Sequence, residues 1–322
     1  MEYRNMGRTG LKLSRLAFGS WVTFGDQIDS AKASELIHLA YDRGINYFDN
    51  ADIYANGKSE EVMGHAIQDL PREALVLSSK VFWKTMPGPN GRGLSRKHIM
   101  ESCDASLQRM GIDYLDLYFC HRYDPETPLE EVVRAMEDLV RQGKILYWGT
   151  SEWRAGQIAR AFTIAERWGA YPPVVEQPQY NMLVRRKMED ELVQAADDLG
   201  FGMVTWSPLK YGLLTGKYNE GMPEEETRLT REPSWAESVV TEERVEKVRK
   251  LTALAEKIGM SMPQLAIAWA LRIPQVTSVI LGATKTSHLE DNLQALDGVD
   301  KLSEDVLEQI EEILDNKPEP VA

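Results

Sequence analysis

Cysteine is scarce in this sequence, and long apolar runs are missing from it. Only Cys103 and Cys120 occur in 322 residues, and both lie in stretches with an apolar periodicity. Two such cysteines exclude a disulfide framework, so we expect buried thiols in a reducing compartment. No apolar run reaches the roughly 18 residues of a membrane span, and no apolar segment follows residues 1–4. We therefore predict a cytoplasmic protein without membrane insertion.

Basic residues are also in the minority. The chain has 37 Lys and Arg against 50 Asp and Glu, which gives a net charge of −13. A field of this sign repels nucleic acid and anionic lipid, so the basic run at residues 185–187 is interpreted as a solvated helix end. An anionic cofactor would need a local basic pocket. No linker, repeat or low-complexity tract divides the chain, so we predict one domain over residues 1–322.

Short apolar runs alternate with amphipathic helical patterns along the chain. The helical patterns include residues 31–43, 95–110, 129–141 and 263–271, several of which have Ser, Thr or Pro near their starts. Strict alternation implies parallel strands with right-handed crossovers, and eight units can close into a barrel. The strands are expected at residues 16–19, 46–49, 75–80, 115–121, 145–151, 174–177, 203–207 and 278–282.

The fold class expected from this alternation is α/β, a (β/α)₈ TIM barrel. An open, doubly wound sheet is the competing architecture, although no G-x-G-x-x-G motif follows a predicted strand. Residues 3–13 are expected to form a β-hairpin that plugs the bottom of the barrel. Residues 209–241 are too long for an ordinary connection and are interpreted as a lid loop after the seventh strand. Residues 303–314 predict an extra C-terminal helix.

Four polar residues stand at or just after three neighbouring strand ends, where the active site of a barrel gathers. Asp49 ends the second strand, Tyr54 follows it, Lys80 ends the third and His121 ends the fourth. Each can be explained alone as a solvated strand end or a satisfied buried group. Together they suit carbonyl reduction, which needs a proton donor beside the carbon that accepts hydride.

The chemistry of these four side chains predicts a role for each. A phenol has a pKa of about 10 and gives up its proton reluctantly, but a nearby cation lowers that pKa. Lys80 can supply this charge to Tyr54, and Asp49 can keep the buried ammonium protonated. His121 can donate a hydrogen bond to the carbonyl oxygen and so polarise it.

Asp49, Tyr54, Lys80 and His121 resemble the catalytic tetrad of the aldo-keto reductases, in order and in strand position. The likeness runs from residues 10–14 through 113–117 and 148–151 to 281–283. The branch it resembles most is that of the potassium-channel β-subunits and their bacterial relatives, through residues 92–99, 206–209, 264–269 and 316–318. The resemblance implies an NADPH-dependent oxidoreductase that reduces a small aldehyde or ketone, without a metal, as a possible homo-tetramer.

The resemblance also assigns cofactor positions. Ser151, Glu152 and Gln177 match residues that face the nicotinamide carboxamide, and Trp206 matches a ring that stacks beside the nicotinamide. A set from the first loop, the lid and the last strand and helix is implied to touch the remainder of NADPH: Ser20, Trp21, Gln27, Asp49, Ser207, Pro208, Leu209, Gly212, Lys217, Arg228, Gly282, Thr284, His288, Asp291 and Asn292. Arg228 is expected near the adenosine end, and a helix N-terminus suits phosphate.

Trp21, Trp83, Trp153 and Tyr211 are candidates for the wall of the substrate site. The channel β-subunits carry Asn where His121 stands, so this chain has the enzyme pattern there, and Glu152 replaces an Asn or Arg. One alternative is a redox-sensing subunit that holds NADPH and docks on a partner protein. A metal-dependent hydrolase on a barrel is another, which the absence of paired His at strand ends disfavours.

Overall fold

The computed structural model describes residues 1–21, 24, 28–231 and 233–318. Eight of its strands lie in one barrel. In chain order they are β3 (Leu16–Gly19), β4 (Tyr47–Asp49), β5 (Val76–Val81), β6 (Leu115–Cys120), β7 (Ile145–Ser151), β8 (Val175–Gln177), β9 (Gly202–Thr205) and β10 (Val276–Leu281).

The eight strands are parallel, and each pairs with the next along the chain until β10 pairs with β3. The closing register puts Val279 opposite Leu16 and Leu281 opposite Phe18. This closed sheet confirms the predicted (β/α)₈ barrel and excludes the doubly wound alternative. The predicted strand ends differ from the observed ones by two residues at most.

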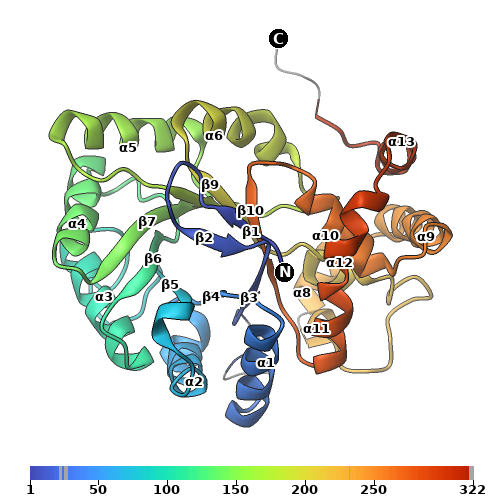
Figure 1. Cartoon of the computed structure of the whole chain (residues 1–322), viewed down its shortest axis with the longest axis horizontal. Helices are drawn as coiled ribbons and strands as arrows, with labels where there is room; N and C mark the ends of the chain where they lie inside the picture. The colour runs from blue at the N-terminus through green and yellow to red at the C-terminus, as the bar shows by residue number, and fades with distance from the viewer. Residues whose placement is uncertain (22–23, 25–27, 232, 319–322) are drawn as a thin grey trace.

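Helices surround the barrel, as Figure 1 shows. Those that follow strands and pack on the outside are α1 (Ser30–Asp42), α2 (Lys58–Ala66), α3 (Arg96–Met110), α4 (Leu129–Arg141), α5 (Ala155–Trp168), α6 (Val193–Leu199), α9 (Glu242–Lys257), α10 (Met262–Leu271) and α11 (Thr286–Leu293). The short α12 (Ala295–Gly298) and the predicted extra helix α13 (Glu304–Leu314) complete the chain.

Local sequence sets where these helices begin and end. The Ser95 side chain accepts a hydrogen bond from His98 N at the start of α3, and Gly111 ends the helix with φ +65°. Ser261 and Gln264 form a capping box at the start of α10. Side-chain oxygens thus satisfy amides that the first turn of a helix leaves unpaired, and glycine takes the left-handed terminal position without strain.

A hairpin formed by β1 (Tyr3–Asn5) and β2 (Lys12–Ser14) covers one end of the barrel, as predicted. Its turn is tied to the loop before β9, because Arg8 N donates to Gly200 O at 2.8 Å. Gly7 has φ +53°, and a Cβ there would lie 2.3 Å from the same carbonyl oxygen. The turn therefore requires glycine for close backbone approach.

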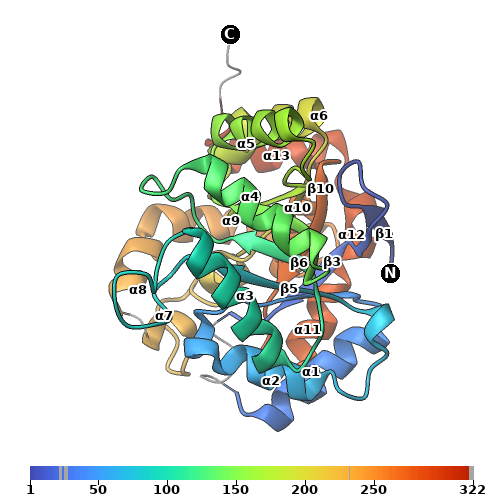
Figure 2. The same ribbon diagram turned by 90° about the vertical axis from the view of Figure 1, so that its left-hand side faces the viewer.

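The segment after β9 is only partly a loop, which corrects the prediction for residues 209–241. It contains the 3₁₀ helix η4 (Lys210–Thr215) and two short helices, α7 (Arg228–Arg231) and α8 (Pro233–Val239). Leu229 and Val239 are buried against the core, and this packing stabilises helical turns in a segment whose Gly and Pro residues do not favour them. Figure 2 shows α7 and α8 at the end of the molecule opposite the hairpin.

Cys103 and Cys120 are buried free thiols, as expected. Burial raises the pKa of the Cys103 thiol to about 12, which keeps it protonated and unreactive. Among the helices that the structure describes, none is both long enough and apolar enough to cross a membrane.

Candidate active site

A cavity of about 1140 Å³ opens at the carboxyl ends of the barrel strands, beneath α7. Most residues expected to touch cofactor or substrate line it: Trp21, Asp49, Tyr54, Trp83, His121, Ser151, Gln177, Trp206, Ser207, Pro208, Leu209, Tyr211, Gly212, Lys217, Arg228, Gly282, Thr284, His288, Asp291 and Asn292. The fold therefore brings together in one cavity residues that are up to 271 positions apart in sequence, from 21 to 292.

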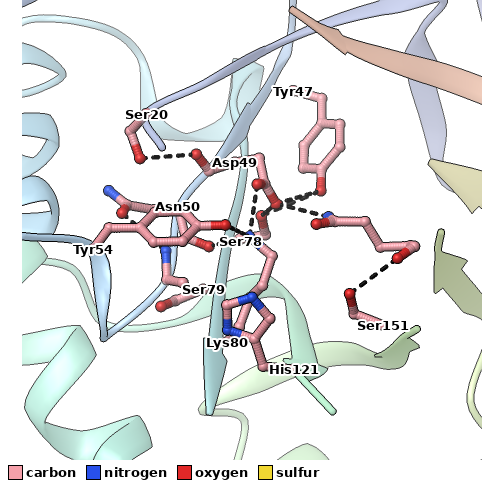
Figure 3. A network of polar contacts seen from close by, with 12 residues as sticks. Ser20, Tyr47, Asp49, Asn50, Tyr54, Ser78, Ser79, Lys80, His121 and Ser151 are labelled. Carbon is pink, nitrogen blue, oxygen red and sulfur yellow. Dashed lines mark hydrogen bonds and ion pairs between the residues drawn. The ribbon is translucent and has the colours of Figure 1, made fainter. Parts of the chain in front are cut away.

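Lys80 lies behind this cavity and joins the groups that were expected to work together. Its side chain is fully buried, and Nζ donates to Asp49 Oδ2 at 2.6 Å and to the Asn50 carbonyl oxygen at 2.6 Å. The third donation goes to the Tyr54 hydroxyl at 3.2 Å. Figure 3 shows the phenol, the ammonium and the carboxylate side by side. All three ammonium protons thus have an acceptor.

The second carboxylate oxygen of Asp49, Oδ1, accepts three hydrogen bonds. Oδ1 accepts from the hydroxyls of Tyr47 at 3.1 Å and Ser78 at 2.8 Å, and from Gln177 Nε2 at 3.0 Å. Ser151 Oγ donates in turn to the Gln177 carbonyl oxygen at 2.9 Å. The carboxylate that pairs with Lys80 therefore has little freedom, and the network extends across the barrel to β7 and β8.

The pKa values of the buried pair follow from burial and charge. Desolvation lowers the pKa of the Lys80 ammonium, but the neighbouring side chains of Asp49 and Tyr54 together outweigh it and the pKa is raised. Desolvation raises the pKa of the Tyr54 phenol, and Lys80 opposes that rise. Lys80 thus acts in the predicted direction, but burial outweighs it, which corrects the expectation of a net lowered pKa. Tyr54 is a protonated phenol at neutral pH.

His121 stands next to the phenol, with the two ring centroids 5.9 Å apart and nearly perpendicular. It is 7% exposed, and burial, with help from Lys80 and Arg122, holds its pKa well below the ordinary value. The imidazole is therefore neutral. Its Nδ1 has no hydrogen-bond partner among the described residues, so the ring can offer an N–H to a ligand oxygen from one nitrogen or the other.

Aromatic rings form the walls beside Tyr54. Trp21 lies 6.4 Å from the Tyr54 ring and 6.0 Å from Tyr211, and Trp83 lies 6.3 Å from His121. The Arg228 guanidinium is 4.0 Å from the centre of the Trp21 ring. α7 thus brings Arg228 over Trp21, near the catalytic end of the cavity. Its expected place near the adenosine end of the cofactor stays a prediction.

Basic side chains gather at the opposite end of the cavity. Lys217, Lys285 and His288 line it, together with the start of α11. Burial lowers the pKa of both His288 and Lys217, and Lys285 lowers each further. The mutual effect indicates that the three are close enough to repel one another. This end of the cavity therefore attracts an anion, and His288 adds little positive charge until one is bound.

Three more of the predicted residues lie outside the cavity lining. Ser20 is fully buried with its hydroxyl on the Asp49 carbonyl oxygen, and Trp153 is fully buried against Tyr123, so neither lines the cavity. Glu152 points behind the cavity wall and accepts hydrogen bonds from protein groups. Gln27 falls outside the described residues. The position of Trp153 after a strand predicts a place in the substrate wall, but the turn at Glu152 directs the ring into the core.

Two cavity residues and one buried carboxylate are not indicated by the sequence analysis. Arg122 follows His121 and lies 5.6 Å from the Trp83 ring, and Lys285 joins the basic end. Glu176 is fully buried on β8, with its pKa raised to about 7 mainly by desolvation. Adjacency to His121 and to Thr284 could have indicated the two cations. Nothing in the sequence marks Glu176, because its environment is set by β7 and by the segment before α6.

Comparisons with known proteins identify relatives over nearly the whole chain. A model of the Aldo/keto reductase family matches residues 15–315. The chain is 46% identical, over 99% of its length and 98% of the relative's, to a probable voltage-gated potassium channel subunit beta of Arabidopsis thaliana. It is 45% identical to the protein of the same name in Oryza sativa subsp. japonica, over 99% and 98% of the two chains. A putative voltage-gated potassium channel subunit beta of Schizosaccharomyces pombe is 44% identical over 99% and 94%.

Proposed function

Because this chain belongs to the aldo/keto reductase family, we propose that it is an NADPH-dependent oxidoreductase that reduces small aldehydes or ketones. The observation that carries the proposal is the phenol of Tyr54 in the cavity, 3.2 Å from a buried ammonium that is itself paired with Asp49 at 2.6 Å. This arrangement suits a general acid held beside a carbonyl oxygen.

The cavity fits the cofactor that the family implies. A volume of about 1140 Å³ is ample for a dinucleotide and a small substrate. Ser151 and Gln177 would hold the carboxamide beside Asp49, and Trp206 would lie against the nicotinamide. Lys217, Lys285 and the first turn of α11 would take the phosphates, since cations and helix-start amides favour anions.

NADPH, when bound, supplies the hydride that reduces the carbonyl carbon. The chain's own residues do the rest. His121 donates a hydrogen bond to the carbonyl oxygen and polarises it, and Tyr54 transfers its proton to that oxygen as negative charge develops there. Lys80 stabilises the phenolate that remains, because an ammonium lies within hydrogen-bond distance. The aromatic walls of Trp21, Trp83 and Tyr211 exclude water and favour a small, partly apolar substrate.

A second candidate function is an NADPH-binding redox sensor that docks on a partner protein. The names of the three relatives favour it, since each is called a potassium channel subunit. His121 favours the enzyme, because the resemblance places Asn at this position in channel β-subunits. A cytoplasmic location and a homo-tetramer remain predictions under either function.

A panel of aldehydes and ketones, followed by NADPH absorbance, separates the two functions. If the protein is a reductase, steady-state turnover should be observed and should depend on Tyr54. If it is a sensor, NADPH should bind tightly but be oxidised about once per molecule of protein at most. Tight binding without turnover on the whole panel would therefore overturn the proposal in favour of the sensor.

A further inference from the structure

Glu152 stands at the end of β7 in a backbone conformation that its residue type rarely adopts. Its φ is +59°, in the left-handed region, which costs a residue with a Cβ about 1 kcal/mol or more. The turn points the side chain away from the cavity, whereas the preceding Ser151 lines it. A strained residue at a functional site calls for a compensating contact.

The Glu152 carboxylate has three protein partners. Oε1 accepts from the Trp206 indole Nε1 at 3.0 Å and from the backbone N–H of Gln179 at 2.6 Å, and Oε2 accepts from Lys187 Nζ at 3.1 Å. Lys187 also lies 3.9 Å from Glu176, which is fully buried. The Lys187 ammonium therefore fixes the Glu152 carboxylate on the side away from the cavity, and the carboxylate in turn holds the Trp206 indole, which lines the cavity.

Trp206 is the cavity residue in this set. It lines the cavity directly after β9, and its ring lies nearly perpendicular to that of Trp21, with centroids 5.5 Å apart. The backbone of Trp206 is fixed by hydrogen bonds to Pro178 and Tyr180, which leave rotation about the side-chain bonds free. The hydrogen bond from Nε1 to Glu152 removes that freedom, because another rotamer would break it.

We propose that Glu152 is a positioning residue that sets the angle of the Trp206 ring against the nicotinamide ring of the cofactor. This role replaces the direct contact with the carboxamide that resemblance implied for Glu152. It rests on the proposed use of NADPH, and it makes Glu152 act on the cofactor only through the indole. Lys187 keeps the carboxylate in place and makes no contact with the cofactor.

A double-mutant cycle on NADPH binding tests the role. Glu152→Ala should weaken NADPH binding about tenfold, the lower range for loss of a hydrogen bond to a charged group. Trp206→Phe keeps a ring but has no N–H. In that background Glu152→Ala should change affinity by less than about twofold, because coupled residues are not additive. Equal effects in both backgrounds would mean that Glu152 acts through Gln179, and would overturn the proposal.

The conservative variant separates the hydrogen bond from the charge. Glu152→Gln keeps an oxygen acceptor for the indole and should bind NADPH within about twofold of wild type. If Glu152→Gln were as weak as Glu152→Ala, the ion pair with Lys187 would carry the effect and the proposal would fail. Glu166→Ala, which removes an exposed carboxylate from α5, is the matched control and should bind NADPH normally.

A measurement on the cofactor-free protein covers the case in which a variant is unstable or inactive. In protein labelled with ¹⁵N at the tryptophan indoles, Trp206→Phe identifies the resonance of the Trp206 N–H. Glu152→Ala should move that resonance upfield, as expected for a lost hydrogen bond, and Glu152→Gln should move it less. An unmoved resonance would overturn the contact. If the protein reduced no carbonyl but showed this shift and the expected coupling between Glu152 and Trp206 in NADPH binding, the proposed reductase function would be wrong and the positioning role of Glu152 would remain supported.

Discussion

Two lysine–carboxylate clusters lie at strand ends of the same barrel, and they differ in what they face. Lys80 joins Asp49 at 2.6 Å and also reaches a hydroxyl that opens into the cavity. Lys187 joins Glu152 at 3.1 Å and Glu176 at 3.9 Å, behind the wall formed by Trp206. The first cluster contacts the Tyr54 hydroxyl, which can transfer a proton. The second contacts the Trp206 indole, which it can only position.

The difference lies in the third partner of each lysine cluster. Each places an ammonium beside a buried carboxylate, and burial is costly for the ions in both. The phenol of Tyr54 makes the first cluster a proton donor. The indole of Trp206 donates a hydrogen bond but does not release its proton at physiological pH. A buried ion pair near a cavity therefore does not identify a catalytic group until the atoms between the pair and the cavity are known.

The largest effect on kcat is expected from removal of the Tyr54 hydroxyl, which carries the reacting proton. Tyr54→Phe should lower kcat by roughly 10²–10⁴-fold and leave NADPH affinity within about twofold, since only the hydroxyl is lost. Steady-state turnover and a fluorescence titration of NADPH measure the two quantities. A Phe variant that keeps kcat within about threefold of wild type would remove Tyr54 from the chemistry.

The two lysines should separate sharply when each is changed to methionine. Lys80→Met removes the charge that stabilises the Tyr54 phenolate, and we expect kcat to fall by at least about 100-fold. Lys187→Met leaves the phenol untouched and should cost less than about tenfold, mainly in NADPH affinity. Comparable losses of kcat in the two variants would contradict the distinction between a catalytic and a supporting cluster.

A smaller effect is expected at the basic end of the cavity. Lys285→Ala should reduce the preference for NADPH over NADH by about tenfold and leave NADH affinity nearly unchanged, because one contact to the extra phosphate is lost. The wild-type preference should also shrink as salt is raised. Titrations of both cofactors give the ratio, and Lys257→Ala, which removes an exposed lysine at the end of α9, is the control. A ratio unaffected by Lys285→Ala would place the phosphate elsewhere.

The smallest effect concerns stability and pH. Burial raises the pKa of Glu176 from 4.5 to about 7, so the folded protein binds a proton there that the unfolded chain releases. The folded state should therefore lose stability as pH rises through this window, by about 3 kcal/mol at most from this group. Glu176→Gln should flatten the dependence. Urea unfolding below and above the window measures it, and an unchanged slope would mean that Glu176 is ionised in the folded state.

The residues found from sequence share a simple property. Asp49, Lys80 and His121 follow apolar runs at strand ends, and Tyr54 follows in the loop after Asp49, where the barrel topology itself brings polar side chains together. The strands were located within two residues, because their apolar runs are short and bounded by polar residues.

The residues that were misplaced depend on the direction of a side chain and on tertiary packing. The positive φ of Glu152 turns its carboxylate behind the cavity and sends Trp153 into the core, and no pattern of residue types reports such a turn. Resemblance gives the position of a residue along the chain, whereas the local backbone decides what that residue touches.

The pairing of β3 with β10, which closes the barrel, affects how the chain folds during its synthesis. Leu16 leaves the ribosome about 263 residues before its partner Val279, which corresponds to tens of seconds at roughly 5–20 residues per second. During that interval one edge of β3 has no strand to pair with, and an unpaired edge invites association with other chains. The order of synthesis therefore exposes the chain to aggregation before the sheet can close. Circular permutants that bring the two strands together in sequence should refold faster and with less aggregation.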